Sequence, residues 1–377
     1  MCGEHQKRDN MTDVELVSRS LAEMASPDFR GLDDPYGVLA LSERKRMAFL
    51  HNPFVDDKGM HCQAVGVMGK VAIGGEIHFP LYWRVDGKLI KVRYGSTTFV
   101  AKGHRKTALG LLIPDFTNKV YPAVINAGAG CSQMMLRMLH YWKEPVFLLP
   151  RMVMLFKSRA VIEMKLHGFV SRLVAGCVDL GLRLYWMAVR FWVHYKLKGY
   201  VFETRSDYDA DTFRQVADLI AADKHPYAEL HDLRWLKWHL TESFTMDDPM
   251  TLTLVKRDGV LIAFYMTKIR FHEQASARGF KNVRLGSIME WQIRHEDEAD
   301  LPWILLRASC DMRGKVDAVE LVVPDTLLER FFRRCGWRHV GESNFTFHIH
   351  SEVLKKDADI FVKENWRLRP AMGDAGL

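Results

Sequence analysis

The most informative residues of this chain are Phe99-Val100-Ala101-Lys102-Gly103-His104-Arg105-Lys106-Thr107-Ala108-Leu109-Gly110. Apolar, aromatic and β-branched residues dominate the stretch 89–100 and predict a β-strand there. The stretch 108–113 can open a helix. A basic, small-residue turn between a strand and a helix N-terminus suits a phosphate group, because the first N–H groups of a helix have no intrahelical partner and the helix dipole favours an anion.

The side chains of this turn fit such a site. Lys102, Arg105 and Lys106 add positive charge, while Ala108 and Gly110 let the backbone come close to phosphate oxygens. The pattern from Arg105 to Gly110 resembles the Arg/Gln-x-x-Gly/Ala-x-Gly/Ala signature of the GNAT (GCN5-related N-acetyltransferase) superfamily, which binds the pyrophosphate of coenzyme A; Ala108 replaces the usual first glycine. The alternative is an exposed basic turn that binds no ligand. The resemblance implies a CoA-binding set of Phe99, Val100, Arg105, Lys106, Thr107, Ala108, Leu109 and Gly110.

The flanking segments follow the order expected for such a domain. Strands are predicted over 63–79 and 81–85, with glycine pairs marking bends and a turn at Asp86-Gly87. Another strand is predicted over 123–128, followed by a helix over 132–141. Strands, signature, helix, strand and helix in this order resemble an acyltransferase domain of the GNAT superfamily.

The second half of the chain repeats this plan without the signature. A hairpin is predicted over 251–266 and a central strand over 286–293. The stretch 294–300 that follows is acidic and would repel a pyrophosphate. Residues 331–337 resemble the helix-then-Gly-aromatic ending of the family. Phe332 stands where many members have a tyrosine that protonates the leaving thiolate, so that role is not available at this position.

We therefore expect an α+β (mixed α/β) fold of two GNAT-like domains, each a twisted, mostly antiparallel sheet flanked by helices, joined by a long apolar helix. A chain of 377 residues is long enough for two such domains and a connector. The expected parts are an N-terminal helical or flexible segment (1–39), a GNAT-like domain with the CoA signature (40–150), an amphipathic helical connector (151–198), a second GNAT-like domain that can be degenerate in CoA binding (199–350) and a C-terminal tail (351–377).

The connector is almost continuously apolar over 166–198. Its polar residues are spaced by seven, seven, four, seven and four residues, which returns them to one narrow stripe of a helix. Such a helix can pack between domains, form the seam of a homodimer, or lie in a membrane interface. A spanning helix is disfavoured because four charges fall within 172–190. The polar stripe consists of Lys165, Arg172, Asp179, Arg183, Arg190 and His194.

The resemblance also implies a chemistry. In this superfamily backbone N–H groups of a central strand, here the one ending at Val100, polarise the thioester carbonyl of the acyl-CoA. The acceptor amine must be neutral to attack, so a carboxylate or histidine serves as general base. The candidates are Glu76 and His78 on the preceding strand, and Glu290 on the matching strand of the second half. For each of them a plain solvated strand face is the alternative.

The amino-acid composition indicates which classes of ligand and partner to expect. The 53 Lys+Arg against 46 Asp+Glu give a net charge of +7, which suits anionic ligands such as CoA. No nucleic-acid-binding signature accompanies this charge, so nucleic acid is not an expected partner. The six cysteines show no Cys-x-x-Cys spacing, and His348-x-His350 lacks further ligands, so we expect reduced thiols and no metal. The polar first ten residues carry no secretory signal, which favours a cytoplasmic protein, either free or membrane-associated.

The function that these observations favour is N-acyl transfer from acetyl-CoA or a longer acyl-CoA to an amine-bearing acceptor. Two alternatives stay open. One is an aminoacyl-tRNA-dependent transferase of the peptidoglycan-bridge type, which would bind tRNA in place of CoA. The other is a degenerate acyltransferase fold without turnover that acts as a scaffold at a membrane surface, held there by 166–198.

Overall fold

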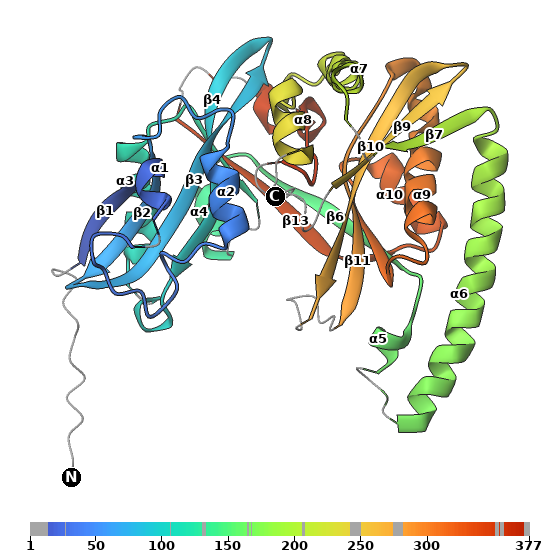
Figure 1. Cartoon of the computed structure of the whole chain (residues 1–377), viewed down its shortest axis with the longest axis horizontal. Helices are drawn as coiled ribbons and strands as arrows, with labels where there is room; N and C mark the ends of the chain where they lie inside the picture. The colour runs from blue at the N-terminus through green and yellow to red at the C-terminus, as the bar shows by residue number, and fades with distance from the viewer. Residues whose placement is uncertain are drawn as a thin grey trace. The chain divides into compact units, whose positions relative to one another are not determined.

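The computed structural model describes residues 14–26, 28–105, 107–129, 133–163, 166, 168–205, 208–241, 250–273, 282–350, 354 and 358–372 (Figure 1). Lys106 and Lys165, both named above, lie outside these residues. The chain divides into two compact units, and each is a mixed α/β assembly. The first unit comprises residues 1–83, 89–129 and 347–356, and the second comprises 84–88, 130–346 and 357–377.

The first unit is built on a sheet in which β1 to β5 lie side by side in chain order. β1 pairs with β2 and β2 with β3 in antiparallel fashion, whereas β4 and β5 run parallel. The turn between β3 and β4 has positive φ at Asp86 and Gly87, as expected for a tight hairpin. The elements are β1 (Val14–Ser20), α1 (Leu21–Met24), α2 (Glu43–Leu50), β2 (His61–Met68), β3 (Val71–Val85), β4 (Lys88–Val100), η2 (Lys102–His104), α3 (Leu109–Val120) and β5 (Ile125–Ala129).

β1 lies within the stretch 1–39, where we expected helical or flexible chain. It pairs with β2 from Val14 opposite Met68 to Ser20 opposite His61, so long-range pairing decides its conformation. The buried Arg19 side chain fixes this edge by donating to the Leu39 carbonyl at 3.2 Å. Among the described residues of this stretch the helical segment is the short α1 that follows, and it begins at a capping box formed by Ser20 and Glu23.

Glycines in β2 and β3 make room for α3. A Cβ on Gly66 would lie 2.8 Å from Leu109 Cδ1, and one on Gly74 would lie 3.0 Å from the Phe99 carbonyl oxygen and 3.1 Å from Leu109 Cδ2. The glycine pair at 74–75 was expected to mark a bend, but β3 runs unbroken through it. Its physical role is close packing: Leu109 and Ile113 of α3 rest on the sheet at these positions.

The second unit contains a sheet with the strand order β13-β6-β12-β11-β10-β9-β7. Within it β11 and β12 are parallel, and the other pairs for which register is given are antiparallel. The elements are α4 (Gln133–Tyr141), β6 (Val146–Leu155), α5 (Arg159–Ile162), α6 (Gly168–Lys196), β7 (Tyr200–Arg205), α7 (Ala210–Ala221), β8 (Tyr227–Glu229), α8 (Leu233–Leu240), β9 (Met250–Arg257), β10 (Val260–His272), β11 (Val283–Ile293), η4 (His295–Asp300), α9 (Leu301–Met312), β12 (Ala318–Val322), α10 (Thr326–Arg334), β13 (Arg338–Ile349), η5 (Ala358–Phe361), η6 (Lys363–Asn365) and β14 (Trp366–Arg367).

The core of this unit lies between the sheet and three helices. Side chains of α6, α9 and α10 form one buried cluster with β10 and β11, including Trp186, Leu305, Phe332 and Trp291. Helices α7 and α8 lie on the opposite side of the sheet (Figure 1). The hairpin predicted over 251–266 is present as β9 and β10.

The units do not divide the chain where the sequence suggested, at 150 and 198. β6 (Val146–Leu155) is a central strand of the second unit, inserted between β12 and β13. β13 in turn begins in the second unit, and its last residues, from Phe347 on, belong to the first. The predicted helix over 166–198 is confirmed as α6, which is part of the second unit. Among the described residues, no helix is both long and apolar enough to cross a bilayer.

Candidate functional site

The strand pairing of the first unit stops early. β4 is paired with β5 only from Val92 opposite Ile125 to Gly95 opposite Gly128. β4 nevertheless continues to Val100. β4 therefore extends several residues beyond its register with β5, which ends at Gly95. An opening of this kind between two parallel neighbours can offer backbone N–H groups to a ligand.

The basic turn begins where β4 ends. The 3-10 turn η2 is closed by the His104 N–H, which donates to the Ala101 carbonyl at 2.8 Å. The Thr107 hydroxyl donates to the His104 carbonyl at 2.7 Å and accepts from the Leu109 N–H at 3.2 Å. Lys102 and Arg105 are exposed, and Arg105 Nε donates to the Val100 carbonyl at 3.1 Å. The turn is thus held by its own hydrogen bonds, with its charges directed to solvent.

The structure brings the described members of the predicted CoA-binding set together around this turn, at the N-terminus of α3. They do not all have the same role. Leu109 is buried in the core beneath α3 and its N–H is already used by Thr107, so it positions the helix. Phe99 is half-buried and packs against a cluster that includes Phe29 and Val38. At Gly110 there is open space, because a Cβ there would meet only Val100 Cγ2, at 3.9 Å.

Glu76 and His78 lie on the same face of β3, as their spacing predicted, but both are buried, so the alternative of a solvated face is wrong. Glu76 lies beside the point where β4 leaves β5: its Oε1 is 3.4 Å from where a Cβ of Gly95 would stand. Burial raises the pKa of Glu76, although Arg93 acts in the opposite direction. Its Oε2 has no hydrogen-bond partner among the described residues.

His78 is less suited to take up a proton. Burial lowers its pKa well below the usual range, and the Arg93 charge lowers it further. The ring is neutral, and its Nε2 lies 3.0 Å from the His61 carbonyl oxygen, where an N–H can donate. The ring also stacks on Tyr121 with centroids 5.2 Å apart. These contacts favour a positioning role for His78.

A series of polar contacts beside Glu76 was not expected from the sequence. Arg93 donates to Asn118 Oδ1 at 2.6 Å, and Asn126 Nδ2 donates to the same oxygen at 2.7 Å. Asn126 also contacts His350 Nε2 at 2.5 Å. The signal that could have revealed it was a charged residue, Arg93, between Val92 and Tyr94 in the middle of β4. His350, at the end of β13, joins this polar series through Asn126, and its ring centroid lies 4.3 Å from that of His348.

The matching opening in the second unit is filled by the chain itself. β11 pairs with β12 only from Leu285 to Ile288. Beyond that point the Met289 carbonyl accepts from the Ala371 N–H at 2.9 Å, and the Trp291 carbonyl accepts from Arg369 Nε at 3.2 Å. The loop after β11 is acidic, as predicted, and its Asp297 is paired with Arg257 at 2.5 Å. A cleft of about 1510 Å³ beside this segment has walls of mixed charge.

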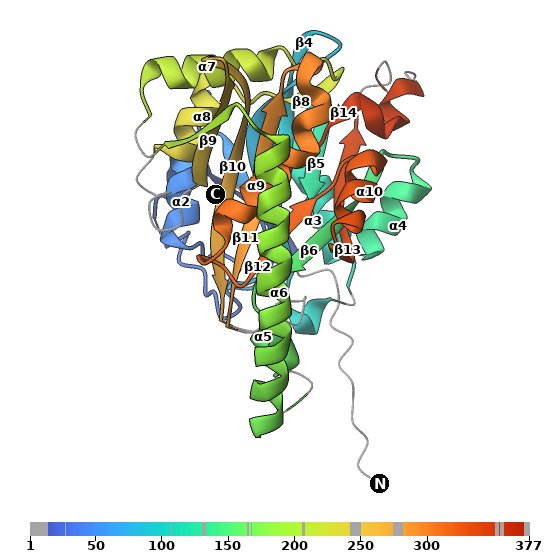
Figure 2. The same ribbon diagram turned by 90° about the vertical axis from the view of Figure 1, so that its right-hand side faces the viewer.

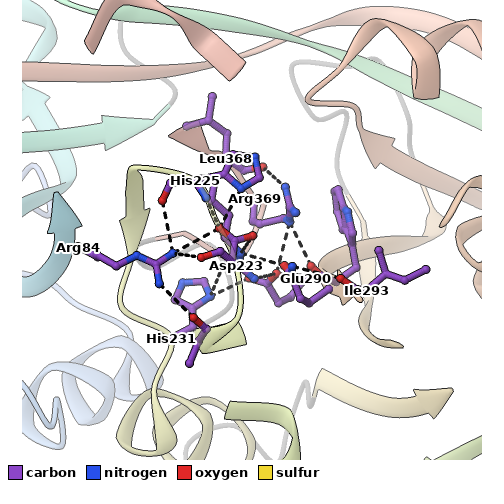
Figure 3. Close-up of polar contacts among 12 residues, drawn as sticks. Arg84, Asp223, His225, His231, Glu290, Ile293, Leu368 and Arg369 are labelled. Carbon is purple, nitrogen blue, oxygen red and sulfur yellow. Dashed lines mark hydrogen bonds and ion pairs between the residues drawn. The ribbon is translucent and has the colours of Figure 1, made fainter. Parts of the chain in front are cut away.

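Glu290 lies at the centre of a buried ionic network (Figure 3). Its carboxylate accepts from Arg367 at 2.7 Å and from the Trp291 N–H at 2.8 Å, and lies 2.7 Å from His231 Nδ1 as an ion pair. Burial alone would raise the pKa of Glu290, but the Arg367 and His231 charges hold it down at about 2. Glu229 pairs with the other nitrogen of His231 at 3.1 Å. This geometry favours a structural ion pair over a proton acceptor.

No family model matches the chain, and no curated protein matches its sequence. Solved structures do match. The N-myristoyltransferase of Saccharomyces cerevisiae with bound myristoyl-CoA is 11% identical over 90% of this chain and 79% of its own, with a TM-score of 0.57. A conserved protein of unknown function from Enterococcus faecalis, described as a probable N-acyltransferase, is 9% identical over 93% of this chain and 74% of its own, with a TM-score of 0.53.

A GCN5-related N-acetyltransferase from Kribbella flavida also aligns, at 11% identity over 89% of this chain and 71% of its own, with a TM-score of 0.48. At such identities the likeness concerns the fold. The parallel central strands that part after a short pairing, followed by a turn and a helix, occur in both units. The chain therefore shares the mixed α/β fold of the yeast N-myristoyltransferase and of the Enterococcus faecalis protein.

Proposed function

We propose that this protein is an N-acyltransferase that moves an acyl group from acyl-CoA to an amine, and that the first unit holds the acyl-CoA. The observation that carries the proposal is the juxtaposition of the end of β4, which runs on past its pairing with β5, an exposed basic turn and a helix N-terminus within 98–110. A structure with this fold, the yeast N-myristoyltransferase, holds bound myristoyl-CoA, which supports an acyl-CoA as the donor. The donor is proposed as acetyl-CoA or a longer acyl-CoA.

In this proposal the turn binds the pyrophosphate. Lys102 and Arg105 supply exposed positive charge, and the N-terminus of α3 adds the positive end of the helix dipole. The open space at Gly110 lets phosphate oxygens approach the backbone. The second unit lacks these features, because its loop is acidic and residues 369–371 occupy the strand opening. One donor site per chain is therefore proposed.

The reaction requires three tasks of the protein. The backbone N–H groups of β4 beyond Gly95 stabilise the oxyanion that forms when the amine nitrogen attacks the thioester carbonyl. Glu76 accepts the proton that the amine loses, since burial raises its pKa toward the range useful at neutral pH. The carbon–sulfur bond then breaks, and the CoA thiolate leaves and takes a proton from solvent. His78 and the chain of Arg93, Asn118 and Asn126 hold the surrounding side chains in place.

A cytoplasmic location is part of the proposal. Free thiols at Cys62, Cys177, Cys310 and Cys335 are compatible with a reducing compartment. The amine acceptor is not specified further.

The decisive test is calorimetric titration of CoA and of acetyl-CoA into the full chain. Arg105→Glu should weaken binding at least ~10-fold, because it reverses a charge beside the phosphates. Arg137→Glu, at an exposed position on α4, is the matched control and should bind as wild type does. Absence of saturable CoA binding to the wild type would overturn the proposal. Binding of aminoacyl-tRNA would then support the tRNA-dependent alternative, and CoA binding without turnover of any amine would support the scaffold.

A further inference from the structure

Helix α6 exposes an apolar surface that none of the described residues of the second unit covers. The helix runs along the outside of this unit (Figures 1 and 2). Four of its residues are buried, Ser171, Ala175, Trp186 and Val193, and they form one stripe. Large side chains stand outside that stripe: Phe169 is 76% exposed and Phe191 is 68% exposed. Leu173, Leu184, Met187 and Trp192 are each more than half exposed.

The buried stripe fixes this surface firmly. The Trp186 indole donates to the Leu155 carbonyl at 3.0 Å and packs against the Phe156 ring in a tilted arrangement, with centroids 4.4 Å apart. The Tyr185 hydroxyl donates to the Cys335 carbonyl. The exposed apolar side chains thus belong to a helix that is held in place by these contacts. A local rotation of the helix therefore cannot bury them. An apolar area of this extent on a soluble surface marks a site of interaction.

The charges on the exposed face have one sign. Arg172, Arg183 and Arg190 are exposed, whereas the Lys196 ammonium lies over the Trp303 ring, 5.8 Å from its centroid. The one carboxylate within α6 is Asp179, which is turned toward the unit: it accepts from the Ser158 N–H at 2.6 Å and from its hydroxyl at 2.7 Å. A face with arginines and no free carboxylate is complementary to a negatively charged surface.

The same charges argue against a second copy of the chain as the partner. In a two-fold symmetric dimer each face meets an identical face. Two α6 faces would bring Arg172, Arg183 and Arg190 of both copies into one apolar interface without a carboxylate to pair them. Desolvated charges without partners are strongly unfavourable. At a lipid surface, long arginine side chains can instead reach the headgroups while the apolar residues enter the acyl boundary.

We propose that α6 docks the protein on the surface of a bilayer that contains anionic lipids. The helix lies flat in the interface, with its exposed apolar side chains among the upper acyl chains. Its 29 residues give a contact roughly 43 Å long. An aromatic cluster near its C-terminal end consists of Phe191, Trp192 and Tyr195. The Trp192 ring centroid lies 6.4 Å from that of Phe191 and 6.3 Å from that of Tyr195. Such rings are typical of side chains at the headgroup level.

The test is co-sedimentation of the full chain with vesicles. Wild type should bind vesicles of phosphatidylcholine with phosphatidylglycerol and bind pure phosphatidylcholine far more weakly. Leu184→Ser with Phe191→Ser removes apolar contact without touching the core, and should lower the partition at least ~10-fold. Arg172→Gln with Arg183→Gln and Arg190→Gln should lower binding to the anionic vesicles ~100-fold and remove the lipid preference.

Tyr141→Ser is the matched control, since Tyr141 is a large exposed side chain on another helix, and it should bind as wild type does. Circular dichroism should show that all variants are folded. The proposal is overturned if wild type stays in the supernatant with anionic vesicles. It is also overturned if both sets of α6 variants sediment as wild type does, or if wild type is a dimer that these substitutions dissociate. CoA titration of the same variants should be unchanged, which separates this result from the proposed activity.

Discussion

Replacing Arg367 by leucine is the sharpest test of how the second unit is held together. The guanidinium donates to the fully buried Glu290 at 2.7 Å and is itself buried. With Arg367 and His231 present, the pKa of Glu290 is about 2, against an ordinary value of 4.5. At 1.36 kcal/mol per pKa unit this gap corresponds to about 3 kcal/mol of stability. Arg367→Leu should therefore lower the free energy of unfolding by about 3 kcal/mol at neutral pH, since it leaves a buried carboxylate without its main partner.

The sign of the pH dependence follows from the same pKa. A carboxyl whose pKa is lowered in the folded state stabilises the protein above its unfolded pKa, and this stability is lost as the pH falls from 4.5 toward 2. Without Arg367, burial pushes the pKa of Glu290 in the opposite direction, so the carboxyl takes up a proton at higher pH. The difference in stability between wild type and Arg367→Leu should therefore grow as the pH rises from about 4 to neutrality.

The measurement is urea unfolding at several pH values, followed by circular dichroism and tryptophan fluorescence. Arg159→Leu is the control: Arg159 pairs with Glu163 on the surface, where solvent screens the pair, so this substitution should leave the free energy of unfolding close to that of wild type. Glu290→Gln combined with Arg367→Leu should be more stable than Arg367→Leu alone, because the unpaired charge is gone. The reasoning fails if the free energy of unfolding of Arg367→Leu stays within about 1 kcal/mol of the wild-type value at every pH. It also fails if the effects of the two substitutions on this free energy are additive.

Three further outcomes are expected in the first unit. Gly110→Val should fold as wild type does, because only one side-chain atom lies within 4 Å of the new Cβ; thermal unfolding would show this. The same substitution should weaken CoA binding at least ~10-fold in a calorimetric titration, because it fills the space left for phosphate. Gly74→Ala should cost about 1–3 kcal/mol in urea unfolding through its 3.0 Å approach to a backbone carbonyl, whereas Gly176→Ala on α6, in open space, should not destabilise the protein. Glu76→Gln should lower kcat about 10²–10⁴-fold with CoA affinity unchanged. The wild-type rate should rise with pH through a pKa above 4.5, as burial of Glu76 requires, and a variant with the wild-type rate would exclude it as the base.

The parts that could be predicted from the sequence are those with local patterns. The strand ending at Val100, the basic turn and α3 follow one another within a few residues, so their order and chemistry are visible directly. The hairpin of β9 and β10 and helix α6 were predicted for the same reason. The burial of Glu76 and His78 was not, because alternation along a strand shows which residues share a face but not whether that face is covered.

The features that could not be predicted depend on residues far apart in the chain. Glu290 has the spacing of a solvated strand residue, and only Arg367, 77 residues later, makes it part of a buried network. The backbone contact of Ala371 with Met289 depends in the same way on the C-terminal segment. β1 has a weak pattern of its own and becomes a strand by pairing with β2.

The position of β6 has a consequence for how the protein is made. β6 pairs with β13 at Phe147 opposite Phe345, so a strand synthesised early finds its partner nearly two hundred residues later. Contacts of such long sequence separation slow folding and leave strand edges exposed in the meantime. On the ribosome, residues 146–155 emerge well before β12 and β13 exist to flank them. The nascent chain should therefore depend on chaperones until its last strands are synthesised, and genes cut near residue 150 or 198 should yield fragments that aggregate unless both are produced together.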